Sequence, residues 1–310
     1  MNTTFWGKSG WQFLHTLTFI YPENPSFSNK VKMREFMNSL QYILPCKYCR
    51  NSFAIYIKSV RIDDYLASRN RVIEWLYKIH NKINKKLRSQ GFCKHSNPML
   101  DDIISKYTEK PDSIIKTIIK LYSQHSNSLD NGNDNGNDNG NDNGNGIRLQ
   151  KTINYICNLG ADFLGSIVYN YQGYYTNCHT GDEKTRIVSV YNTFFNSIIP
   201  MICSFLENSK FNTDSGECSS IKYKIKAFNI RYILQHNQPY TKLIEWFYKC
   251  TDLCTMEKEY GSIDNYEKHF EKHVVLSCDN PKINKSKINS CRKDIARKLS
   301  KKLSKIKPIS

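Results

Sequence analysis

Residues 28–60 read SNKVKMREFMNSLQYILPCKYCRNSFAIYIKSV, and this stretch decides the fold of the first half of the chain. Apolar residues recur in it at helical spacing on both sides of Pro45: Val31, Met33, Phe36, Leu40 and Ile43 before it, Phe53, Ile57 and Val60 after it. Because proline cannot continue a helix, the spacing predicts a helix from a cap at Ser28 to the residues before Pro45. A further helix is predicted over about residues 50–60.

A CxxC pair, Cys46 and Cys49, lies at or near the N-terminal turn of that second helix. Backbone N–H groups and the positive end of a helix dipole stabilise a thiolate, which lowers the pKa of the thiol and favours disulfide exchange. Lys47 and Arg50 add positive charge beside the pair. The pattern favours a redox-active disulfide.

Half of a zinc site is the alternative interpretation of the same pair, since zinc needs two further ligands. The candidates in the first half form no second CxxC or CxxH motif: His15, His80, Cys93, His95 and His125. A thioredoxin fold would need alternating strands and helices, whereas the apolar pattern of residues 8–122 is helical throughout. A helical bundle with a redox CxxC therefore remains the favoured interpretation.

Further helices are predicted over residues 8–20, 70–89 and part of 99–122, and their short connections favour a compact bundle. Trp11 and His15 lie four residues apart on the first, as His80 and Asn84 do on the long one. An aromatic ring and two imidazoles in a helical core could stack on and hydrogen-bond a planar cofactor, although each residue alone is more often core packing.

The chain divides at residues 129–146, LDNGNDNGNDNGNDNGNG, which cannot bury enough apolar surface to fold. The sequence thus predicts an all-α protein with a domain over residues 1–128, a disordered linker over 129–146, a second, mostly helical domain over 147–281, and a basic tail over 282–310. The helical segments expected in the second domain are 147–170, 185–208, 220–236, 240–258 and 264–276.

The net charge of +17 is unevenly distributed. Residues 147–281 carry equal numbers of acidic and basic side chains, so the excess lies in the first domain and in the tail. Contact with nucleic acid is expected only through the tail, which could equally be a solvated end. No apolar run is long enough to span a bilayer, and no signal peptide precedes the domain, so we expect a cytoplasmic protein that is neither secreted nor membrane-bound.

Three motifs occur in order: GKSGWQFLH at 7–15, PCKYC at 45–49 and HNKIN at 80–84. Over about residues 5–108 the sequence resembles the Erv/ALR sulfhydryl oxidases, flavoenzymes with a four-helix bundle and a short fifth helix. The resemblance implies FAD as cofactor, with contacts from Lys8, Trp11, His15, His80, Asn81, Asn84 and Lys85 or Lys86.

The same resemblance implies a mechanism. A protein dithiol attacks the Cys46–Cys49 disulfide at Cys46, and Cys49, next to the flavin, passes two electrons on, so that dioxygen is reduced to hydrogen peroxide. It also implies a homodimer and admits a thioredoxin-like relay partner. The competing hypothesis is a non-enzymatic helical protein that binds zinc or nucleic acid.

The sequence departs from the family pattern in two places. Tyr77 stands where many members have the first cysteine of a further disulfide, which leaves Cys93 without that partner. The aromatic contact that some members place after this point has no tryptophan here, and Tyr107 is the candidate replacement.

The second domain resembles no family, and three hypotheses describe its cysteines. Cys250 and Cys254 could be a shuttle pair that delivers electrons to Cys46, although i, i+4 spacing is long for a disulfide unless the helix ends there. With His269 and His273 they also form a C-x3-C-x14-H-x3-H pattern close to that of a zinc finger. The third hypothesis is an interaction module with structural cysteines.

The richness in Asn, Lys and Ile suggests an AT-rich genome such as that of a large DNA virus, in which case the protein would act in the host cytosol or the virion.

Overall fold

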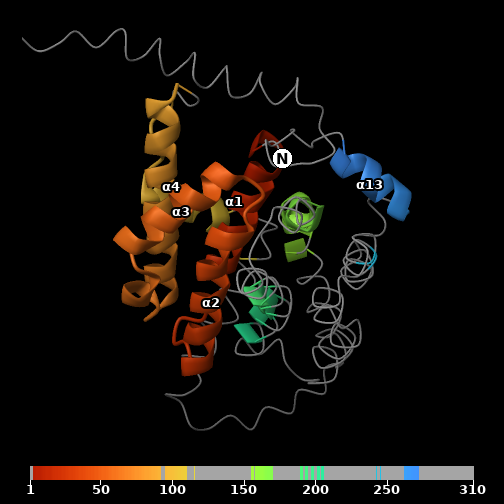
Figure 1. Ribbon diagram of the computed structural model, residues 1–310. Helices are drawn as coiled ribbons and strands as arrows, with labels where there is room; N and C mark the ends of the chain where they lie inside the picture. Colours follow the sequence, from red (N-terminus) through yellow and green to blue (C-terminus); the bar gives the residue numbers. More distant parts are fainter. Residues whose placement is uncertain are drawn as a thin grey trace, which may run out of the picture.

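The computed structural model is helical, with no strand in the part of the chain that it describes (Figure 1). This confirms the prediction of an all-α protein. The structure describes residues 3–91, 95–109, 115, 155–156, 158–169, 189–190, 193–194, 197–198, 201–202, 204–205, 242, 245 and 262–271.

Four helices form the N-terminal bundle, with a 3-10 turn and a short fifth helix beside them. In chain order they are α1 (Thr3–Phe19), α2 (Phe27–Ile43), α3 (Lys47–Ser59), η1 (Ile62–Tyr65), α4 (Arg69–Ser89) and α5 (Leu100–Thr108). Helix α1 packs on α4, α4 on α3, and α3 on α2. Tyr107 of α5 stacks on Phe19 of α1, with ring centroids 4.8 Å apart, and this contact holds α5 against the bundle.

The predicted cap of α2 was wrong by two residues. Ser26, not Ser28, is the N-cap: its Oγ accepts a hydrogen bond from the backbone N–H of Asn29 at 3.1 Å, while the Asn29 side chain accepts from the N–H of Ser26 at 3.0 Å. The helix stops before Pro45, as predicted, and α3 begins at Lys47 with Cys46 as its N-cap. The CxxC pair therefore lies at the first turn of a helix, as predicted.

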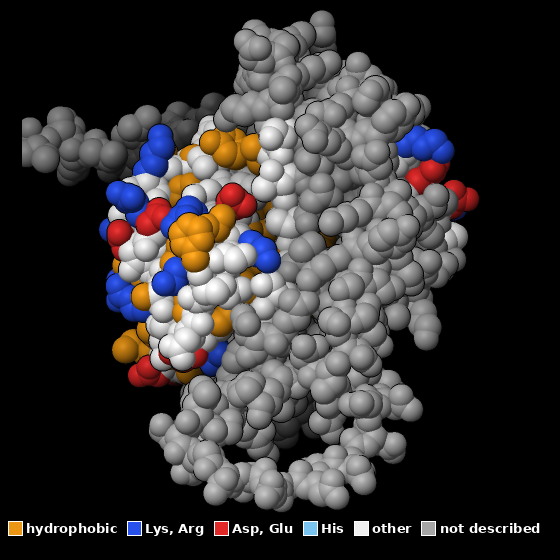
Figure 2. All heavy atoms as spheres, turned by 90° about the horizontal axis from the view of Figure 1, so that it is seen from below, with side chains coloured by type: hydrophobic (Ala, Val, Ile, Leu, Met, Phe, Trp, Pro, Cys, Tyr) orange, Lys and Arg blue, Asp and Glu red, His pale blue; other side chains and the backbone are white. Residues whose placement is uncertain are grey.

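The larger of two apolar clusters in the described residues joins the bundle to the described part of the second half, and the smaller one joins α5 to α1 and α4. The first-half members of the larger cluster include Trp75, which is fully buried and donates its indole N–H to the carbonyl oxygen of Val60 at 2.8 Å. This bond fixes α4 against the end of α3. On the outer surface of the bundle, charged side chains of both signs alternate with scattered apolar ones (Figure 2).

Residues of the second half pack on the side of α1 and α2 that faces away from α4 (Figure 1). The described residues of 158–169 and of 189–205 are helical, as is α13 (Ile263–Glu271), which agrees with the predicted segments. Aromatic contacts connect the two halves of the chain. The stacked rings of Phe36 and Phe194 have centroids 5.1 Å apart, and the rings of Tyr21 and Phe205, which meet edge-on, have centroids 5.4 Å apart.

Several predictions fall on residues outside the described part: the linker 129–146, the tail 282–310, and Cys93, Cys250, Cys254 and His273. Among the helices that are described, none has the length and apolar character needed to cross a membrane.

Replacing Trp75 by Phe should lower the free energy of unfolding by about 2 kcal/mol, because the Val60 carbonyl loses its donor and a cavity forms. Denaturant titration followed by circular dichroism measures this change. The matched control is Ile55→Ala on the exposed side of α3, which should stay within about 0.5 kcal/mol of the wild type. Equal effects of the two substitutions would show that Trp75 is not part of the core.

Candidate redox site

Cys46 and Cys49 face each other across the first turn of α3. The backbone N–H of Cys49 points at the Sγ of Cys46, at 3.4 Å, so the sulfur takes the place that a serine or aspartate oxygen usually holds at an N-cap. Both side chains are half-buried and both are thiols in this structure. The CxxC thus joins a helix cap to a pair of adjacent sulfurs.

The two thiols differ in acidity. The hydrogen bond from the Cys49 thiol lowers the pKa of Cys46 to about 6, and the backbone N–H groups of Cys49 and Tyr48 act in the same direction against the effect of burial. The pKa of Cys49 is raised, because its proton is held by Cys46 and because it is buried. In the reduced pair, one proton therefore stays on Cys49 and Cys46 carries the thiolate.

Two cations act against the rise in the pKa of Cys49. Lys86 of α4 and Arg50 of α3 each lower the pKa of the Cys49 thiol through their charge. The ammonium of Lys86 donates to the hydroxyl of Ser52, which in turn donates to the carbonyl oxygen of Tyr48 at 2.8 Å. Ser52 was not among the predicted site residues. Its position three residues after Cys49, one turn along α3, was the signal that could have revealed it.

Trp11, His15 and His80 form an aromatic cluster between α1 and α4, as their spacing predicted. The rings of Trp11 and His80 stack in parallel with centroids 3.7 Å apart, and Nε2 of His15 lies 3.2 Å from Nδ1 of His80. Tyr107 approaches His15 with ring centroids 5.6 Å apart. Trp11 packs against the same core as both cysteines, and α4 carries both His80 and Lys86.

Burial makes this cluster electrically neutral. It lowers the pKa of His15 to about 3 and that of His80 to about 4, with a smaller contribution from the charge of Lys106. Nδ1 of His15 is buried and has no hydrogen-bond partner among the described residues. A neutral aromatic surface with an unsatisfied ring nitrogen fits a planar heteroaromatic ligand that can stack and accept or donate one hydrogen bond.

The other predicted cofactor contacts are more dispersed. Lys8 is exposed on α1, and Asn84 is half-buried on α4 one turn after His80. Asn81 lies apart from the aromatic cluster, in the wall of a surface groove.

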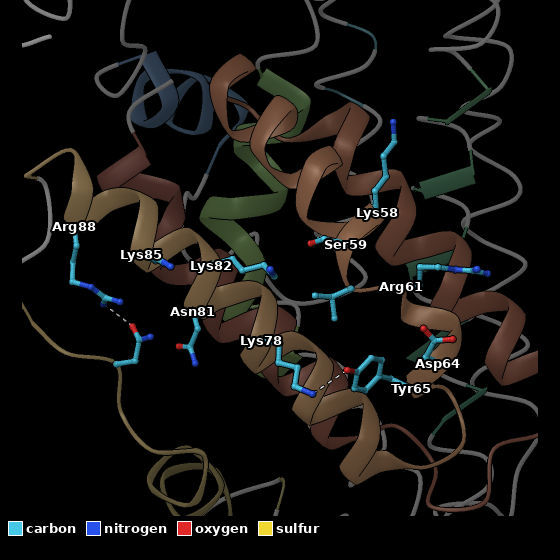
Figure 3. A pocket seen from close by; sticks show the side chains of 12 residues that line it. Lys58, Ser59, Arg61, Asp64, Tyr65, Lys78, Asn81, Lys82, Lys85 and Arg88 are labelled. Carbon is cyan, nitrogen blue, oxygen red and sulfur yellow. Dashed lines mark hydrogen bonds between the residues drawn. The ribbon is translucent and has the colours of Figure 1, made fainter. Parts of the chain in front are cut away.

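This groove is basic and was not predicted. It lies between α4 and the end of α3 and has a volume of about 670 Å³ (Figure 3). Consecutive residues of an α-helix are turned by about 100° relative to each other. Lys82 follows His80 by two residues and therefore points to the opposite side of α4. The charged residues that line the groove are Lys58, Arg61, Asp64, Lys78, Lys82, Lys85 and Arg88.

Within the described residues, no three His, Cys, Asp or Glu side chains come together in an arrangement that could hold a metal ion. His269 is one of the four residues of the zinc-finger pattern. Its Nε2 lies 3.0 Å from Oδ1 of Asp162, and its ring packs against the ring of Phe5.

The sequence around this site is similar to that of a known family. Residues 8–102 match the sequence profile of the Erv1 / Alr family. The chain is 36% identical over 85 residues to the "Probable FAD-linked sulfhydryl oxidase R368" of Acanthamoeba polyphaga mimivirus, which covers 27% of this chain and 59% of the relative.

Two further relatives come from a fungus and from another virus. One is the "Mitochondrial FAD-linked sulfhydryl oxidase ERV1" of Saccharomyces cerevisiae, 36% identical over 28% of this chain and 44% of the relative. The other is the "Putative FAD-linked sulfhydryl oxidase 096R" of Invertebrate iridescent virus 3, 29% identical over 28% of this chain and 59% of the relative.

The chain spans about half the length of these relatives, and no solved structure matches it. The matched residues contain the CxxC pair, the Trp11–His15–His80 cluster and Lys86. Residues 8–102 of this chain are therefore similar to the domain that the Erv1 / Alr family model describes.

Proposed function

We propose that this protein is an FAD-dependent sulfhydryl oxidase that forms disulfide bonds in protein dithiols. The observation that carries the proposal is the unequal CxxC pair at the start of α3, in which Cys46 favours the thiolate and Cys49 retains the proton. The names of the relatives of residues 8–102, all of them FAD-linked sulfhydryl oxidases, support it.

The oxidised pair would exchange disulfides with the substrate. A substrate thiolate attacks the Sγ of Cys46, which breaks the Cys46–Cys49 bond and releases Cys49 as a thiolate. The second substrate thiolate then attacks the substrate sulfur of the mixed disulfide, which forms the substrate disulfide and releases Cys46. Two electrons remain on the pair, and the positive charges of Lys86 and Arg50 stabilise Cys49 when it is the thiolate that leaves.

FAD, when bound, would supply a two-electron acceptor that reduces dioxygen to hydrogen peroxide. Trp11, His15 and His80 would bind its flat ring system, and Asn81, Asn84, Lys8 and Lys86 are the further proposed contacts. The buried Nδ1 of His15 provides a free hydrogen-bonding atom for such a ligand. The low pKa values of both histidines keep this surface neutral at physiological pH.

Protein dithiols and dioxygen are the proposed substrates, and a thioredoxin-like protein or the Cys250/Cys254 pair is the proposed relay to Cys46. The homodimer and the cytoplasmic location, including the host cytosol or the virion, remain predictions.

Replacing Cys46 or Cys49 by Ser should reduce thiol oxidation at least about a thousand-fold, because a single sulfur cannot form the internal disulfide. Oxygen consumption with a reduced protein substrate measures this loss. Both variants should keep the visible absorption of bound flavin, which separates lost chemistry from lost folding. Cys291→Ser in the tail is the control and should keep full activity; a fully active Cys46→Ser variant would refute the proposal.

Alkylation of Cys46 in the reduced protein should rise with pH around a midpoint of about 6, since the thiol is unreactive when protonated below its pKa. Iodoacetamide labelling followed by mass spectrometry measures this profile, because tryptic cleavage after Lys47 separates Cys46 from Cys49. Cys49→Ala removes the main hydrogen bond and should move the midpoint upward. Cys49→Ser retains a donor and should leave it low. Identical profiles for the two variants would contradict the assigned hydrogen bond.

His80→Ala should lower the flavin content of the purified protein at least about ten-fold, because the stacked pair with Trp11 is lost. Visible absorbance relative to protein concentration measures the content. Tyr65→Phe, at the basic groove, is the control and should bind flavin normally. Undiminished flavin in His80→Ala would place the cofactor elsewhere.

A further inference from the structure

Two short sequences of the bundle recur in the second half of the chain. Residues 10–14 of α1 read GWQFL, and residues 160–164 read GADFL. Residues 36–40 of α2 read FMNSL, and residues 194–198 read FFNSI. The two motifs follow each other in the same order in both halves. Such short matches are weak by themselves, but in the structure the matching segments pack against each other.

The glycine and the phenylalanine of the first motif make reciprocal contacts. A Cβ atom at Gly10 would lie 2.9 Å from the ring of Phe163, and a Cβ atom at Gly160 would lie 2.7 Å from the ring of Phe13. Each phenylalanine thus fills the space that the glycine of the other segment leaves open. Reciprocal contacts of this kind are the signature of packing across a twofold axis.

Two residues also pack on their own counterparts. The rings of Phe13 and Phe163 lie 6.0 Å apart, and those of Phe36 and Phe194 lie 5.1 Å apart at an interplanar angle of 15°. A residue meets its own equivalent only close to a twofold axis. All four rings are fully buried.

Local details recur as well. Ser39 donates its hydroxyl to the carbonyl oxygen of Phe36 at 2.6 Å, and Ser197 donates in the same way to Phe194 at 3.0 Å. On α1 and on the matching helical segment 158–169, Thr16 and its counterpart Ser166 are both fully buried. The hydroxyl of each has no hydrogen-bond partner among the described residues.

We propose that the described residues of 158–169 and of 189–205 belong to a second, degenerate copy of the α1–α2 helix pair, which packs on the first copy across a quasi-twofold axis. The apolar face of α1 and α2 is then closed by the same chain, and the partner that this face fits is an internal one. This inference is independent of the proposed function.

The second copy has lost the residues of the redox site. Ala161 and Gly165 stand at the positions of Trp11 and His15, and Ser204 stands at the position of Cys46. The ring of Phe270 from α13 occupies the space where a side chain at Gly165 would lie. The second copy therefore acts as a structural partner without a redox pair.

The test compares three Gly→Ala substitutions in the full-length chain by thermal unfolding. Gly10→Ala and Gly160→Ala should each lower Tm by about 5 °C, the effect of overpacking by one methyl group in a chain of this size. Gly7→Ala is the matched control: a Cβ atom there meets nothing within 4 Å, so Tm should stay the same or rise. If all three substitutions behave alike, the proposal is wrong.

Double variants test whether the contacts are reciprocal. In a Phe163→Ala background, Gly10→Ala should no longer lower Tm, and in a Phe13→Ala background, Gly160→Ala should no longer do so. Full additivity in both pairs would overturn the proposal.

Protein concentration separates an internal contact from one between chains. The coupling in both pairs should be the same over a hundred-fold range of concentration. A wild-type Tm that rises with concentration, together with a Gly160→Ala Tm that does not, would place the contact between chains and overturn the proposal.

Discussion

The burial of α1 on two sides links the bundle to the second half of the chain. One side carries His15 and meets α4, and the other carries Phe13 and meets residues 160–163. A helix of one amphipathic stripe could not satisfy both, so α1 is apolar over most of its circumference, and Gly10 lies where the ring of Phe163 must enter. The cofactor cluster and the contact between the halves therefore depend on the same helix.

Acidity in the CxxC pair results from four influences. The hydrogen bond between the two thiols lowers the pKa of Cys46 and raises that of Cys49, and burial disfavours negative charge at both sulfurs. The backbone N–H groups at the helix start favour negative charge at Cys46, and the cations of Lys86 and Arg50 favour it at Cys49. Disulfide exchange requires each sulfur in turn to leave as a thiolate, Cys49 when the substrate attacks and Cys46 when the substrate disulfide forms. An arrangement in which the proton moves between two sulfurs under nearby positive charge meets both requirements without moving the helix.

The bundle and the site were predictable from sequence to different extents. Pro45 and the helical spacing around it located α2, α3 and the CxxC pair, because local chain chemistry decides these features. Ser28 was a wrong choice of cap because Ser26 and Ser28 have the same side chain, and only the position of Asn29 distinguishes them. The basic groove combines residues from two elements, and Ser52 is recognisable only through its contact with Lys86. The GxxFL repeat is too short to stand out until its members are seen in contact.

Joining both partners of a twofold contact in one chain also changes how the contact can evolve. In a symmetric dimer, every substitution appears on both sides of the axis at once, so each position must suit two environments. Within one chain the sides vary independently. His15 could be retained beside α4 while its counterpart became Gly165 and admitted the ring of Phe270. Selection for chemistry on one side and for packing on the other no longer compete for the same residue.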